Sequence, residues 1–143
     1  MVQELQQALE QQLANLTQLS ALLDQELHLI SSRNAEDLIN LLKEKEHTLE
    51  QIQLTDNIVA QHYQPLSASQ SVPDDINEMI EKSKQRVEEC RYKTQVNEKA
   101  VEQGQLRLTH LRNLMLEVRA KESLTYDKSG KPKGSGRGRG ISA

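Results

Sequence analysis

A seven-residue apolar repeat opens the chain and constrains its fold more than any other feature. The repeat consists of Val2, Leu9, Leu16, Leu23 and Ile30. Leu5 and Leu19 occupy its alternate position. Gln12 and Glu26 interrupt it. Because apolar residues that recur every 3.5 residues are typical of a coiled-coil-like helix, the repeat predicts a first helix over residues 2–31.

The apolar pattern lapses at residues 31–34 and then resumes. Asn34 is a favourable helix N-cap, because Glu36 and Asp37 follow it in the first turn, near the positive end of the helix dipole. We expect a tight turn here and an antiparallel second helix over residues 35–63. One continuous helix through the turn is the competing interpretation. The seam of the second helix, meaning the apolar stripe expected to pack against the neighbouring helix, comprises Leu38, Leu41, Leu42, Leu49, Ile52 and Val59.

Residues 64–73 are predicted to form a linker, because Pro65 and Pro73 bracket a stretch without periodicity. A third helix is predicted over residues 74–122. Its seam positions recur at alternating intervals of four and three residues. The middle of that seam is polar or small, at Ser83, Cys90, Thr94, Asn97 and Gly104. Such positions weaken a seam and tend to fix its register. The chain is therefore predicted to be all-α, an elongated antiparallel hairpin or three-helix coiled-coil-like bundle.

Helix lengths predict that the third helix is longer than its partners. At about 1.5 Å per residue, it would extend beyond the hairpin by roughly 20 residues, starting near Gly104. This overhang would leave residues 106–118 uncovered, although they are apolar on several sides of the helix. From residue 125 the periodicity ends, which predicts a helical domain over 1–124 and a flexible, basic, Gly-rich tail over 125–143. Tyr126 would stand exposed at the base of that tail.

Composition argues against catalysis. Cys90 is the only cysteine, so no internal disulfide can form, and on the seam it is expected to be a small buried hydrophobe. The four histidines show no metal-ligand spacing, and the carboxylates lie in Glu/Lys/Gln mixtures typical of solvated helix faces. We therefore expect no enzyme activity, no cofactor and no metal. No apolar run approaches the roughly 20 residues that span a bilayer, and no signal-peptide pattern is present, so we expect a cytoplasmic protein without membrane insertion.

Charge is unevenly distributed along the chain. The net charge is −3, but the segment from Asp127 onward carries five basic residues against one acidic residue, which leaves −7 on the first 126 residues. The basic tail could contact phosphates. However, no aromatic residue stands among its cations to stack on bases, and the body is acidic. We therefore expect no nucleic-acid partner.

The predicted overhang has two interpretations from periodicity alone. It could complete the core or form a homodimer seam, as in a self-associating structural coiled-coil or adaptor protein. Alternatively, it could bind the amphipathic helix of another protein, a common recognition mode. The candidate residues for this binding site are Leu108, Leu111, Leu114, Met115 and Val118.

The order of three motifs resembles the FlgN family of flagellar type III export chaperones. Leu22-Leu23…Glu26-Leu27, followed by AEDLINLLKEK over residues 35–45, resembles the first hairpin of that family. Asn97-Glu98 resembles its Asn-containing midpoint. TYDKSG over residues 125–130, followed by RGRGIS over residues 137–142, resembles its Tyr-x-x-x-Gly tail with a basic end.

The resemblance implies a cytoplasmic chaperone for hook-associated proteins of the FlgK/FlgL type. Such a chaperone would hold the amphipathic terminal helix of its client with the C-terminal part of its last helix, and so prevent premature assembly. It would then deliver the client to the cytoplasmic domain of the export-gate protein FlhA. The tyrosine at position 126 is implied to be the residue that docks on this gate.

Overall fold

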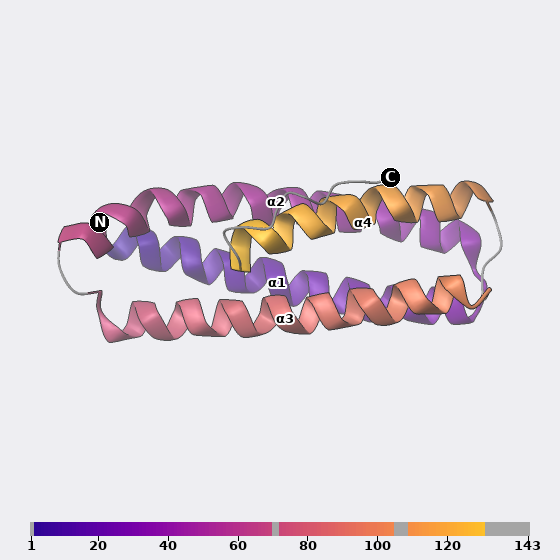
Figure 1. Cartoon of the computed structure of the whole chain (residues 1–143), viewed down its shortest axis with the longest axis horizontal. Helices are drawn as coiled ribbons and strands as arrows, with labels where there is room; N and C mark the ends of the chain where they lie inside the picture. Colours follow the sequence, from indigo (N-terminus) through magenta and orange to yellow (C-terminus); the bar gives the residue numbers. More distant parts are fainter. Residues whose placement is uncertain (1, 70–71, 105–108, 131–143) are drawn as a thin grey trace.

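The computed structural model describes residues 2–69, 72–104 and 109–130, which form four helices along one long axis (Figure 1). These are α1 (Val2–Ser31), α2 (Ala35–Ser69), α3 (Asp74–Glu102) and α4 (Thr109–Gly130). The prediction of an all-α fold is confirmed. Consecutive helices run in opposite directions, so α4 is antiparallel to α3 and parallel to α2 (Figure 1).

The turn between α1 and α2 confirms the hairpin and excludes one continuous helix. Arg33 adopts a left-handed conformation with φ 58°. Its N–H donates to Ile30 O at 3.1 Å, and the N–H of Asn34 donates to Leu29 O at 3.0 Å, as in a Schellman motif. The Asn34 side chain then caps α2, because its Oδ1 accepts from the Asp37 N–H at 3.2 Å.

The core follows the predicted seams. Helix α1 packs against both α2 and α3, and every member of its repeat except Val2 is buried. In α2 the seam leucines and Ile52 are buried, and in α3 Cys90 is fully buried, as predicted. Burying one such leucine stabilises the fold by about 1.5–3 kcal/mol. A second cluster, at the end of the bundle where α2 finishes, contains Leu5, Leu9 and Ile76.

The predicted linker over residues 64–73 is wrong for its first part. Helix α2 continues through Pro65 to Ser69. Proline removes one backbone hydrogen bond and normally ends a helix. Here Leu66 packs against the second cluster, and the Ser67 hydroxyl donates to Gln64 O at 3.1 Å. Tertiary packing therefore keeps the last turn helical despite the proline, and α3 begins at Asp74 as expected.

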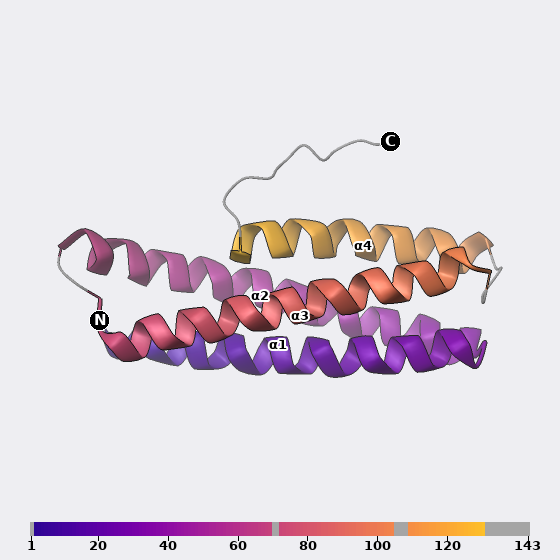
Figure 2. The same cartoon turned by 60° about the horizontal axis from the view of Figure 1, so that its bottom comes forward.

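The single long helix over residues 74–122 is also wrong. Helix α3 ends at Glu102, and Gly104 has φ 82°, in the left-handed region that glycine adopts without a steric penalty. Beyond this break the chain reverses, and α4 packs back on α2 and α3 (Figure 2). The predicted overhang is therefore absent. Helix α4 also extends to Gly130, past the predicted domain boundary at 124/125, while residues 131–143 lie outside the described part of the chain.

Helix α4 lies on the opposite side of the bundle from α1. Figure 2 shows it on the side of α2 and α3 that faces away from α1. Among the described residues it contacts α2 and α3 but not α1. Helices α1, α2 and α3 are termed the three-helix unit, and α4 completes the bundle by adding Val118 and Tyr126 to its main core.

Candidate functional site

Three of the five predicted binding residues lie on the face of α4 that packs against the three-helix unit. Val118 is buried, and the half-buried Leu114 and Met115 pack against the same main core. Leu108 lies outside the described residues, and so does the side chain of Leu111. Leu116 and Leu124, in contrast, are 50% and 62% exposed. Helix α4 thus carries apolar residues on more than one side, and the side that holds Val118 is already occupied.

Tyr126 is buried rather than exposed, so that prediction is wrong. Its exposed fraction is 3%, and the Arg91 guanidinium lies 5.4 Å from the ring centroid. Its hydroxyl is 3.0 Å from Thr94 Oγ1 and donates to Glu122 Oε2 at 3.3 Å. Burial, together with the neighbouring Glu122 carboxylate, raises the pKa of the tyrosine hydroxyl above its ordinary value. Tyr126 is thus one of the residues that attach α4 to α3.

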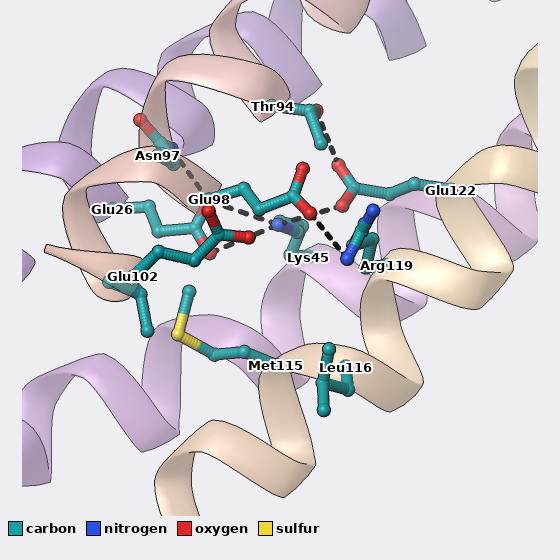
Figure 3. Close-up of a pocket in the computed structure, with 11 residues that line it drawn as sticks. Glu26, Lys45, Thr94, Asn97, Glu98, Glu102, Met115, Leu116, Arg119 and Glu122 are labelled. Carbon is teal, nitrogen blue, oxygen red and sulfur yellow. Dashed lines mark hydrogen bonds and ion pairs between the residues drawn. The ribbon is translucent and has the colours of Figure 1, made fainter. Parts of the chain in front are cut away.

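A buried charge cluster lies beneath α4, with one lysine between two carboxylates (Figure 3). Lys45 Nζ is 3.0 Å from both carboxylate oxygens of Glu26 and 3.2 Å from Glu122 Oε1. All three side chains are almost completely buried. Glu122 Oε2 also accepts from the Thr94 hydroxyl at 2.9 Å. With all three groups ionised, the cluster therefore carries one excess negative charge.

The charges in this cluster perturb one another. Burial alone would lower the pKa of Lys45, but the carboxylates of Glu26 and Glu122 raise it above its usual 10.5. Burial raises the pKa of the Glu122 carboxyl, and the like charge of Glu26 raises it further, although Lys45 opposes both effects. The lysine therefore stays charged, and Glu122 is the group on which a proton would neutralise the cluster.

The cluster divides into a part that needs α4 and a part that does not. Asn97 Nδ2 donates to Glu26 Oε1 at 2.8 Å and to Leu23 O at 2.9 Å. Together with the two Lys45 contacts, this means that the Glu26 carboxylate takes its partners entirely from the three-helix unit. Glu122 and Tyr126 are the members contributed by α4. The polar core of the three-helix unit would consequently remain paired if α4 moved away.

Helix α4 is flanked by a hollow on each side. The hollow toward α3 measures about 400 Å³ and is lined by Val101, Met115 and the charge cluster (Figure 3). The hollow toward α2 measures about 440 Å³, and Leu42 and Val118 are among its lining residues. Both hollows are partly open at the surface, so they are grooves beside α4 rather than voids in the core.

A Glu122→Gln variant tests the pKa assignment. Glutamine keeps the size and one acceptor oxygen of Glu122 but removes the excess charge. We expect the variant to be about 1 kcal/mol more stable than the wild type at pH 8, in urea denaturation followed by circular dichroism. Because the carboxyl pKa is raised in the folded state, its favourable contribution is present below pH 4.5 and lost as the pH rises through the raised value.

The advantage of the Glu122→Gln variant should therefore disappear at about pH 4.5, where the wild-type carboxyl is protonated in the folded state. Glu117→Gln, on the exposed side of α4, is the matched control and should change little at either pH. A destabilisation of Glu122→Gln by more than about 1 kcal/mol at pH 8 would show instead that the ionised carboxylate is favourable in the fold.

The charge cluster was not predicted from the sequence as a site, although two signals pointed to it. Glu26 interrupts the α1 repeat, and Lys45 falls between the seam residues Leu42 and Leu49. An acidic and a basic residue at seam positions of two paired helices indicate a buried ion pair. Glu122 could not be placed with them, because its position depends on the reversal at Gly104.

The described part of the chain holds neither a metal-type cluster of side chains nor a helix suited to span a membrane. Over residues 2–69, 72–104 and 109–130, the His, Cys, Asp and Glu side chains form no group of three or more that could hold a metal ion. Among the same residues, no helix combines the length and the apolar composition needed to cross a membrane. The fold is an elongated helical bundle whose fourth helix carries both buried and exposed apolar residues.

The class of protein that this fold defines is an elongated all-α helical bundle. The model of the FlgN protein family matches residues 1–134, and the chain belongs to this family. Its general role is accordingly that of a flagellar export chaperone, with a protein as its partner. No curated protein and no solved structure matched the chain.

Proposed function

We propose that the protein is a cytoplasmic chaperone for hook-associated proteins of the FlgK/FlgL type. It binds the amphipathic terminal helix of the client, prevents premature assembly and delivers the client to the cytoplasmic domain of the export gate FlhA. The observation that carries this proposal is the family match over residues 1–134. Helix α4, whose Leu114, Met115 and Val118 pack against other helices, supports a helix-binding role.

The client-binding residues proposed for α4 and the segment before it are those predicted from the sequence. They are Leu108, Leu111, Leu114, Met115 and Val118. Apolar side chains at helical spacing form the stripe that an amphipathic partner helix recognises.

Co-expression of the protein with a hook-associated protein tests this function. We expect the full-length client to co-purify with the chaperone, and a client that lacks its terminal helix to be lost. The matched control is a client with an internal deletion of equal length that keeps the terminal helix. Equal recovery of the client with and without its terminal helix would contradict the proposal.

Replacing Tyr126 by alanine tests gate docking. We expect binding of the client-loaded variant to the isolated FlhA cytoplasmic domain to be at least about tenfold weaker, because truncation of an aromatic contact residue typically costs 2 kcal/mol or more. Client binding should be retained. Tyr92→Ala is the control, because Tyr92 is 67% exposed on α3 and outside the proposed docking site. Wild-type affinity of Tyr126→Ala for the gate domain would reject this role.

A further inference from the structure

We infer that the terminal helix of the client packs in line with α4, on the stretch of α2 and α3 that α4 leaves uncovered. This inference deepens the proposed function and rests on it, because it gives the client a contact surface in addition to the residues proposed above. Val118 and its neighbours on α4 already pack against the bundle. The uncovered stretch, in contrast, can receive a helix without displacing any described residue.

Helix α4 covers only part of the length of α3. It has 22 residues and runs antiparallel to α3. The Tyr126 hydroxyl lies 3.0 Å from Thr94 Oγ1, so Gly130 reaches only about one turn farther along α3. Figure 1 shows this end of α4 part-way along the bundle, with α2 and α3 continuing beyond it. About 20 Å of α3, over residues 74–87, therefore has no α4 beside it.

The same is true of the C-terminal part of α2. Glu122 on α4 pairs with Lys45, and the two helices run in parallel, so α4 ends near residue 53 of α2. Among the described residues, α2 and α3 make no contact with each other, and α4 is the helix that contacts both. We call residues 54–69 of α2 and 74–87 of α3 the uncovered stretch. Here α1 is the one described helix that packs on both of them.

Apolar side chains in the uncovered stretch repeat the positions at which α2 and α3 meet α4. On α3, Val101 lines a hollow beside α4, and Thr94 hydrogen-bonds to two residues of α4. Further steps of seven residues lead to Ile80. On α2, steps of seven lead from Leu42, which lines the other hollow, to Tyr63. Leu42 and Val101 are 3% and 6% exposed, whereas Tyr63 and Ile80 are only half-buried. A helix in line with α4 would bury the remainder.

The edge of the uncovered stretch indicates the charge of the helix that fits it. Beside α4, Glu98 of α3 pairs with Arg119. Two steps of seven residues earlier, the same position of α3 is Lys84, which is exposed. A helix that continues the line of α4 should therefore present a carboxylate to Lys84, where α4 presents a guanidinium to Glu98.

An amphipathic terminal helix of a client matches these requirements. About four turns of helix span the roughly 20 Å of the uncovered stretch. Its apolar stripe would cover Ile80 and Tyr63, which already pack against the second cluster. An aspartate or glutamate beside that stripe would pair with Lys84. The client would thus extend the four-helix arrangement that α4 begins, by the same packing of helix on helix.

Photo-cross-linking of the full chain tests this position. Ala60 is exposed on α2, two steps of seven residues after Glu46, which pairs with Lys121 of α4. Benzoylphenylalanine in place of Ala60 should therefore cross-link a terminal-helix peptide of a hook-associated protein. The matched control places it at Ala14, which is exposed on α1, on the opposite side of the bundle from α4. We expect this control to give no cross-link.

Charge reversal provides a second measurement that leaves the core intact. We expect Lys84→Glu to weaken binding of the peptide by at least about fivefold, because an attraction becomes a repulsion. Lys82→Glu carries the same change two residues from Ile80, on another side of α3, and should stay within about twofold of the wild type. Replacing the facing acidic residue of the peptide by lysine should restore most of the affinity lost in Lys84→Glu.

The outcomes separate this inference from the proposed function. If the wild-type chain binds the peptide, equal cross-linking from positions 60 and 14 would overturn the position of the client helix and leave the chaperone function intact. Equal affinities of Lys84→Glu and Lys82→Glu would do the same. Absence of peptide binding to the wild-type chain would overturn both.

Discussion

Replacing Leu111 and Met115 together by aspartate is expected to reduce co-purification of the hook-associated client by at least about a hundredfold. Both residues belong to the stripe proposed to contact the client helix, and a carboxylate in that apolar interface must be desolvated without a partner. Met115 also packs against the main core, so the change weakens the attachment of α4 to the other helices as well. The variant should nevertheless remain helical by circular dichroism, because most buried residues of the main core come from α1, α2 and α3.

The control for this prediction carries the same charge change on the outer side of α4. Ser123 and Leu124 are both exposed, and Leu124 is 62% exposed. Their double replacement by aspartate should leave client recovery within about twofold of the wild type. Undiminished recovery with the Leu111→Asp, Met115→Asp variant would remove these residues from the client site.

Replacing Lys45 by methionine is expected to lower the free energy of unfolding by about 3–5 kcal/mol. Methionine fills a similar volume, so the loss comes from charge rather than from a cavity. The carboxylates of Glu26 and Glu122 remain buried without their cation, and an unpaired buried charge costs far more than the net value of the pair. Urea denaturation followed by circular dichroism at pH 8 measures this loss.

Two comparisons separate the charge effect of Lys45→Met from a general effect of mutation. Lys43→Met, at an exposed position of α2, should change stability by no more than about 0.5 kcal/mol. Adding Glu26→Gln and Glu122→Gln to Lys45→Met removes the orphaned charges and should restore most of the loss. A Lys45→Met variant as stable as Lys43→Met would show that the cluster is not held as a buried ion pair.

Periodicity predicted the three-helix unit because the seam residues of α1, α2 and α3 obey it over long stretches. Leu16, Leu23 and Ile30 are fully buried where the repeat places them. The turn at Asn34 was also predictable, since capping is a local property of the sequence. The helical content past Pro65 was not, because it depends on the contact of Leu66 with residues far along the chain.

The reversal after Gly104 was the feature that sequence reasoning missed. A glycine within a helical pattern permits either continuation or a break, and the pattern on both sides remains helical. Whether the helix continues or breaks at this glycine depends on whether the following segment can pack against other helices. In this chain α4 finds α2 and α3, so Val118 and Tyr126 are buried rather than exposed. The candidate residues remain a proposal, but Val118 and Tyr126 were wrongly predicted to be accessible.

Light scattering coupled to size-exclusion chromatography tests the central claim most directly, because it separates a client chaperone from a self-associating coiled coil. The account predicts a 16.3 kDa monomer alone and a 1:1 complex when a full-length hook-associated protein is added. A stable dimer that does not bind the client, and that dissociates when Leu114 is replaced by aspartate, would contradict the account.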